Sequence, residues 1–167
     1  MQRRRDSRPG PGCTARAASR PRCAALASAC AGILLLMALI DKAAAIAATR
    51  HCRTNVVTAS VDSLTFRAPV RLGHILMMYA SVNASFRTSM EVGVKVLSED
   101  PLSGLRAHCC SAYVTMVALD ALGRPTPVPG LLPGTPEERR RRREAAQRRR
   151  GRLSLRSRKD RPRARRR

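Results

Sequence analysis

The chain has 167 residues, a length from which we expect one domain of ordinary size rather than two. Its 33 Lys and Arg residues outnumber its 11 Asp and Glu residues, so the formal net charge is +22. There is no Trp and there are only two Tyr and two Phe, which argues against the aromatic platforms on which single-stranded nucleic acids stack.

The positive charge lies mainly at the two ends of the chain. Residues 1–22 carry a net charge of +6 and residues 137–167 carry +13, whereas residues 23–136 carry only +3. We therefore expect three segments: a disordered Arg- and Ala-rich leader (1–23), a folded domain (24–133), and a basic helix followed by a disordered Arg-rich tail (134–167).

The six cysteines predict neither a disulfide framework nor a metal site. They stand at positions 13, 23, 30, 52, 109 and 110 without a C-x-x-C pair, and two of them are adjacent. The pairs His51-Cys52 and His108-Cys109 lack the spacing that a tetrahedral zinc site uses. Free thiols in a reducing compartment are the expectation, with no metal.

An uncharged run from Ala24 to Ile40 has three interpretations. It has the character of a signal peptide or membrane anchor, because arginines precede it and its length approaches that of a membrane span. It also suits a mitochondrial presequence, given the Arg/Ser/Ala leader. The third interpretation, a buried helix, fits the following Ala-rich residues best. Gly32 would then mark the start of the helix, and Arg50-His51 would suit its negative end.

Strand periodicity replaces helical periodicity after the helix. Four strands are expected, at residues 55–66, 74–84, 90–96 and 105–119, separated by Gly- and Pro-containing turns. One hydrophobic helix followed by four strands with short loops predicts an α+β protein in which an antiparallel sheet packs on one helix. Because one helix covers too little of such a sheet, dimerisation is expected.

Asp41 is the residue that looks out of place. It stands between Leu39-Ile40 and a run of alanines, so a buried helix would desolvate it and poise it as a general base toward water. The alternative is that Asp41 lies at an exposed helix end beside Lys42. The periodicity does not decide between a buried and an exposed Asp41. Asp62, by contrast, is expected on the solvent face of its strand. The sequence contains no G-x-S-x-G elbow and no phosphate-binding loop.

The stretch from Leu36 to Arg150 resembles the hotdog-fold acyl-CoA thioesterases of the cytosolic acyl-CoA hydrolase family, and in particular the C-terminal hotdog domain of the brain-type enzyme. The segments that carry the resemblance are Leu39-Ile40-Asp41 with the Ala-rich helix, residues 50–62, residues 88–92, and the Pro-rich ending with the basic helix.

The resemblance implies a hotdog fold, in which an antiparallel sheet wraps round one central helix and pairs with a second hotdog subunit, often in hexamers. The implied reaction is hydrolysis of fatty acyl-CoA to fatty acid and CoA without a cofactor. By the family pattern Asp41 is the catalytic base, and the helix start at Gly32 stabilises the oxyanion. The residues that fall on CoA-contacting segments are Ala59, Ser60, Val61, Thr88, Ser89 and Met90.

Two features of the family pattern are replaced here. Cys30-Ala31-Gly32 stands where the family has His-Gly-Gly, and the Arg/Ala leader stands where an upstream strand and an Asn-bearing loop are expected. In two-domain relatives the Asn and the Asp come from different domains, so this chain resembles an Asp-bearing half that needs an Asn-bearing partner.

Three alternatives to an active thioesterase stay open. The chain would be an inactive hotdog fragment, a nucleic-acid-binding protein that uses its arginines, or a protein anchored through residues 24–40. We do not expect nucleic acid as a partner, because the basic helix has a counterpart in the family. We do not expect a membrane either, because an anchor would conflict with the place of Asp41 on the central helix of a hotdog. The expected location is the cytoplasm, with the mitochondrial matrix as the alternative that the leader allows.

Overall fold

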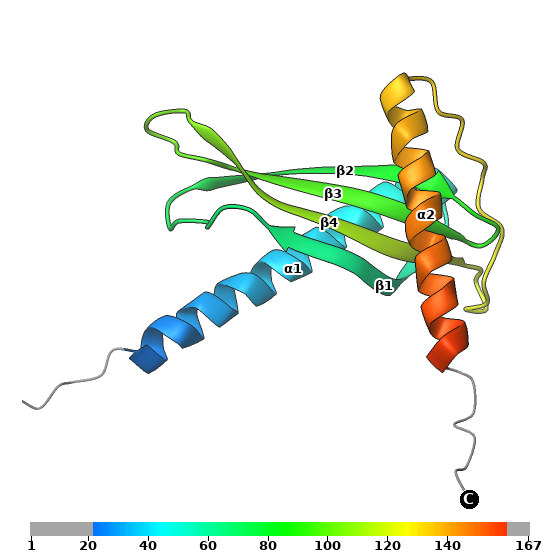
Figure 1. Ribbon diagram of the computed structural model, residues 1–167, viewed down its shortest axis with the longest axis horizontal. Coiled ribbons are helices and arrows are strands. Elements are labelled where there is room, and N and C mark those ends of the chain that lie inside the picture. The colour runs from blue at the N-terminus through cyan, green and yellow to red at the C-terminus, as the bar shows by residue number, and fades with distance from the viewer. Residues whose placement is uncertain (1–21, 160–167) are drawn as a thin grey trace, which may run out of the picture. The chain divides into compact units, whose positions relative to one another are not determined.

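The computed structural model describes residues 22–159. The chain divides into two compact units, Met1–Leu34 and Leu35–Arg167. The described part of the first unit consists of the first turns of helix α1. The second unit holds the rest of α1, a four-stranded sheet and a second helix (Figure 1). The expected disorder of residues 1–21 and 160–167 concerns positions outside the described residues. For Arg22 and Cys23, the last residues of the expected disordered leader, the prediction is wrong, because both already belong to helix α1.

Helix α1 spans Arg22–Cys52, and Arg50 and His51 lie in its last turn as expected. Between Gly32 and Cys52, where burial is described, only a stripe at four-residue spacing is buried, because those positions fall on one helical face. The stripe consists of Leu36, Ile40, Ala44, Ala48 and Cys52.

The prediction of a helix buried on nearly all sides is therefore wrong for this chain by itself. Ile46, for example, is 61% exposed, and only 22% of the apolar stretch within Gly32–Cys52 is buried. This stretch is also long and apolar enough to cross a membrane by length and composition, a test that core helices of soluble proteins pass as well.

Four antiparallel strands form the sheet in the order β1-β4-β3-β2. Their bounds are Asn55–Phe66 for β1, Ile75–Ser85 for β2, Ser89–Glu99 for β3 and Arg106–Leu119 for β4. All four predicted strands and the α+β class are thus confirmed. Within the described residues, β1 and β2 are the edges of the sheet.

The core lies between α1 and one face of the sheet. Alternation along β3 turns Met90, Val92, Val94 and Val96 toward α1, where they pack with the buried stripe of the helix and with β4. Ala44 and Ala48 are fully buried at this contact, because small side chains let a helix approach a sheet closely. The intervening residue Glu91 faces the other side of the sheet.

Helix α2, Pro136–Lys159, crosses that other side (Figure 1). It begins with a capping box: the Glu138 amide donates to Thr135 Oγ1, and Glu138 Oε2 accepts from the Thr135 and Gly134 amides. These backbone hydrogen bonds lower the pKa of Glu138. The predicted basic helix is therefore present, and it packs on the sheet.

Candidate functional site

The structure brings Asp41 of α1 into contact with Thr58 of β1. The Thr58 hydroxyl donates a hydrogen bond of 2.5 Å to Asp41 Oδ1 and also lies 3.4 Å from the sulfur of Met116 on β4. Thr58 and Met116 are opposite each other in the ladder, so both side chains face α1. The Asp41 carboxylate is therefore held at the border between the central helix and the edge strand of the sheet.

Asp41 is exposed in this chain, although it lies in the middle of a helix. Neither sequence-based interpretation describes this fully, because the carboxylate is not desolvated and it is not at a helix end. It lies on the side of α1 that the chain's own sheet leaves open. The second carboxylate oxygen, Oδ2, makes no hydrogen bond among the described residues, so it is available to a water molecule or a ligand.

Thr58 is a site residue that the sequence-based predictions do not include. Its signal was its place in the strand, because Val56 and Thr58 share the face that turns toward α1, and this brings the hydroxyl within reach of the helix. The partner, 17 residues away on a helix, has no local signature in the sequence.

The predicted CoA-contacting residues lie in two places on the sheet. Ala59, Ser60 and Val61 follow Thr58 on the edge strand, where the register with β4 shifts between Thr58 and Ser60 and again between Val61 and Ser63. Such bulges leave residues out of the ladder and are frequent beside active sites. Ala59 and Val61 are exposed.

Thr88, Ser89 and Met90 lie at the start of β3, separated from β1 by β4. Met90 and Thr58 both pair with Met116, so the two groups share one row across the sheet. The Met90 side chain is fully buried in the core, and the Thr88 carbonyl accepts a hydrogen bond from the Ala118 amide. Any contact of Met90 with CoA would consequently involve its backbone.

Gly32 does not stand at a helix start. Helix α1 begins ten residues earlier, at Arg22, because the Ala-rich sequence on both sides of Gly32 favours continuation of the helix. The predicted helix start is therefore wrong. With helix on both sides of Gly32, this arrangement gives no support to an oxyanion site at that residue.

A buried network of charges joins α2 to the outer face of the sheet. Arg148 donates to both oxygens of Glu91, at 2.6 Å and 3.2 Å, and its guanidinium lies 3.7 Å from the centre of the Tyr113 ring. Glu91 is only 1% exposed and also accepts from Asn83. Burial lowers the pKa of Arg148, but the hydrogen bonds and charge of Glu91 outweigh this and raise it.

Asp62 belongs to a second pair on the same face. It forms an ion pair with Arg152 of α2 and accepts hydrogen bonds from Thr115 and Ser60. The expectation that Asp62 faces solvent is wrong, because α2 covers this face and leaves the Asp62 side chain only 10% exposed. The carboxylates of Glu91 and Asp62 therefore hold α2 on the sheet, and neither of them is open to a substrate.

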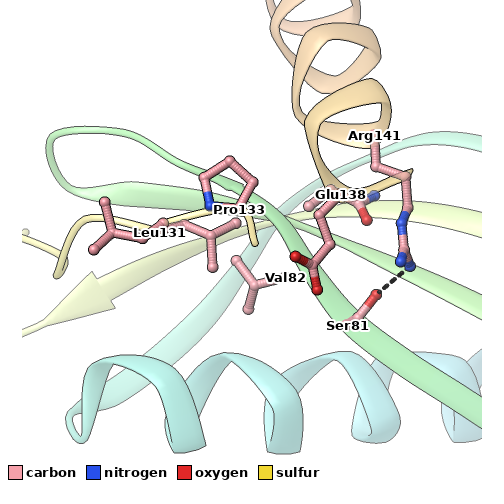
Figure 2. Close-up of a pocket in the computed structure, with 8 residues that line it drawn as sticks. Ser81, Val82, Leu131, Pro133, Glu138 and Arg141 are labelled. Carbon is pink, nitrogen blue, oxygen red and sulfur yellow. Dashed lines mark hydrogen bonds between the residues drawn. The ribbon is translucent and has the colours of Figure 1, made fainter. Parts of the chain in front are cut away.

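A small pocket lies beside the free edge of β2 and the first turns of α2 (Figure 2). Its volume of about 80 Å³ is far too small for a fatty acyl chain, and neither Asp41 nor the predicted CoA-contacting residues line it. Arg141, which donates to Ser81, and the apolar residues Val82, Leu131 and Pro133 contribute to its walls. The described residues contain no cluster of His, Cys, Asp or Glu that could hold a metal ion.

Comparison with known proteins identifies the class. Residues 35–105 match the thioesterase superfamily. A curated relative, protein VdlD of Helicobacter pylori, is 46% identical over 103 residues, which are 62% of this chain and 59% of VdlD. The chain thus spans about three fifths of the length of that relative.

Two solved structures extend the similarity. A hexameric acyl-CoA thioesterase has a TM-score of 0.69 and 40% identity, with 72% of this chain and 77% of that chain covered. Acyl-CoA hydrolase from Staphylococcus aureus, solved with butyryl-CoA and CoA, has a TM-score of 0.69 and 38% identity, with 75% and 76% covered. Structures of its variants, with an asparagine, an aspartate or a threonine replaced by alanine, match as well.

This chain therefore belongs to the thioesterase superfamily and has its hotdog fold. Within that superfamily, the solved structures that it resembles at 38–40% identity are acyl-CoA thioesterases and acyl-CoA hydrolases.

Proposed function

We propose that this protein hydrolyses fatty acyl-CoA, with Asp41 as the general base and Thr58 as the residue that orients it. The contact between Asp41 and Thr58 carries the proposal. In the S. aureus hydrolase the aspartate and the threonine that were replaced are 17 residues apart, and Asp41 and Thr58 have the same separation. The chain supplies the same pair of residue types at the same spacing, and its own fold brings them into contact.

In the proposed reaction a water molecule attacks the thioester carbonyl carbon while Asp41 accepts its proton. The tetrahedral intermediate collapses, the carbon–sulfur bond breaks, and the CoA thiolate leaves and takes up a proton. The Thr58 hydroxyl binds Oδ1, which leaves Oδ2 for the water. The bulged strand segment Ala59–Val61 directly follows Thr58, and we assign the contact with CoA to it and to residues 88–90.

A second hotdog subunit completes this site in our proposal. In the S. aureus enzyme the replaced asparagine lies 15 residues before the aspartate, and the residue 15 before Asp41 here is Leu26. Residues 22–32 are helical, and none of them is Asn. The exposure of Asp41 supports the same view, because a general base works best where a partner excludes bulk water. One solved relative is a hexamer.

The cytoplasm is the location that we propose. Cys52, Cys109 and Cys110 are free and buried, and buried free thiols are compatible with a reducing compartment. Burial raises the pKa of Cys109 and Cys110, which keeps both thiols protonated and unreactive.

Thiol release from palmitoyl-CoA tests the proposed reaction. The wild-type protein should release CoA well above a heat-denatured control, and Asp41→Asn should lower kcat by at least about a hundredfold. Lys42→Gln, which changes the neighbouring exposed residue, is the matched control and should keep wild-type turnover. Equal turnover by Asp41→Asn and wild type would exclude Asp41 as the base. No turnover by the wild type, alone or with an Asn-bearing hotdog protein, would exclude the hydrolase.

A further inference from the structure

The arginines of α2 form two faces with different surroundings. At 100° per residue, Arg141, Arg148 and Arg152 fall on the face that packs on the sheet, where they bind Ser81, Glu91 and Asp62. Away from the sheet the helix carries Arg139, Arg143 and Arg150 on its opposite side and Arg142 on its flank; all four are exposed and form no ion pair among the described residues. We call these four residues the outer arginine face.

The outer arginine face is electrostatically uncompensated. Arg142 and Arg143 follow Arg139 by three and four residues. At these spacings like charges on a helix repel each other. The acids of α2 do not relieve this repulsion, because Glu137 and Glu144 pair with Arg140 and Glu138 caps the helix. An anion bound along this face would relieve the repulsion.

We propose that the outer arginine face binds the phosphate backbone of duplex nucleic acid, without sequence preference. The four guanidinium groups spread over about 16 Å of helix, and a duplex presents a phosphate charge about every 1.7 Å along its axis. Arginine also suits phosphate because its planar fork donates two hydrogen bonds at once. This site is independent of the proposed hydrolase site, and it revises the sequence-based expectation that nucleic acid is not a partner.

The side chains on and beside the outer arginine face favour a duplex over two other anionic partners, a membrane and a single strand. A helix that lies on a membrane needs a continuous apolar face, but the large exposed apolar side chains in the described part of α2, Leu153 and Leu155, both follow the four arginines and do not alternate with them. A single strand needs stacking platforms, and the aromatic rings beside α2, Tyr113 and Phe86, are already covered by Arg148 and Arg149. A duplex backbone requires neither feature.

The salt dependence of binding to a 24-base-pair DNA tests the proposal on the full-length chain. Each phosphate contact contributes about 0.9 to the slope of log K against log salt concentration. Replacing Arg139, Arg142, Arg143 and Arg150 by Gln should therefore lower the slope by about 3 to 4 and weaken binding. The matched control removes four exposed positive charges elsewhere, through Arg53→Gln, Arg67→Gln, Arg71→Gln and Lys95→Gln. It should leave the slope within about 1 of the wild type.

Three outcomes would overturn the proposal. They are an equal loss of slope in both variants, an unchanged slope in the outer-face variant, and tighter binding to phosphatidylserine vesicles or free CoA than to the duplex through the same arginines. Circular dichroism checks that the variants fold. If the fourfold variant does not fold, the pair Arg139→Gln and Arg143→Gln should lower the slope by about 2.

Discussion

The Thr58 hydroxyl is the smallest unit that connects the fold to the proposed chemistry. It lies on a core-facing strand position, beside the sulfur of Met116, and gives its hydrogen to the carboxylate of Asp41. A carboxylate on an exposed helix surface would otherwise sample several rotamers. The hydrogen bond selects one of them and fixes the direction of the free oxygen.

Replacing Thr58 by Val tests this orienting role. Valine keeps the shape of the side chain and removes the donor, and a hydrogen bond to a charged group is worth enough to lower kcat about tenfold. KM for palmitoyl-CoA should stay near the wild-type value, and so should the thermal midpoint. Thr58→Ser keeps the hydroxyl and should restore most of the turnover. A Thr58→Ser enzyme as slow as Thr58→Val would show that the methyl group, and not the hydrogen bond, matters.

At the scale of elements, α2 is held on the sheet mainly by charges. Glu91 reaches Arg148 and Asn83, while Asp62 reaches Arg152, and Ala145 is the one fully buried apolar residue of α2 among those described. Gly93 lets Asn83 approach β3, because a Cβ at this position would lie 2.6 Å from the Asn83 amide nitrogen. The position of α2 therefore depends on a buried carboxylate that keeps its cation.

Truncating Arg148 should expose that dependence. Arg148→Ala leaves the Glu91 carboxylate buried without its cation, which typically costs about 3–5 kcal/mol of unfolding free energy. The double variant Glu91→Leu with Arg148→Leu removes both charges and should recover most of this loss. Urea titration followed by circular dichroism measures all three proteins. Arg140→Gln, which breaks two exposed ion pairs on the same helix, is the control and should change stability little. An Arg148→Ala protein as stable as that control would contradict the prediction.

Local patterns in the sequence predict the elements well, and their long-range pairings poorly. Residues 55–66 match β1 at both ends, because β-branched residues fill the strand and turn residues bound it. Alternation around Met90 and Val92 likewise identifies β3. The start of α1 is wrong by ten residues because nothing in the Ala-rich run stops a helix. The pairs Glu91–Arg148 and Asp62–Arg152 join residues 57 and 90 positions apart, which no local pattern reveals.

At the scale of the whole molecule, part of the excess positive charge has a structural use. Arg148 and Arg152 neutralise two carboxylates of the folded domain, so the basic helix belongs to the fold as well as to the charged end of the chain. The folded domain leaves much of its central helix uncovered. Its central helix is apolar on several sides, while its own sheet covers one stripe of that helix.

Assembly is the expected remedy for this uncovered helix surface. Met37 and Ile46 are exposed apolar side chains of α1, and a helix that leaves several large apolar side chains uncovered is a candidate interface. Sedimentation at about 50 μM should therefore give a mass of at least twice the 18.3 kDa of one chain. Met37→Lys with Ile46→Lys should shift the protein toward the monomer, because each buried charge opposes the interface.

The matched control for this assembly test places the same charges on loops. Leu102 and Leu132 are more than 90% exposed and lie outside the helices and strands, so Leu102→Lys with Leu132→Lys should leave the mass unchanged. A wild-type monomer at 50 μM would contradict the prediction, and an equal effect of both double variants would assign the change to net charge. If assembly also completes the proposed site, turnover per chain should fall together with the mass in the α1 variant and stay constant in the loop variant.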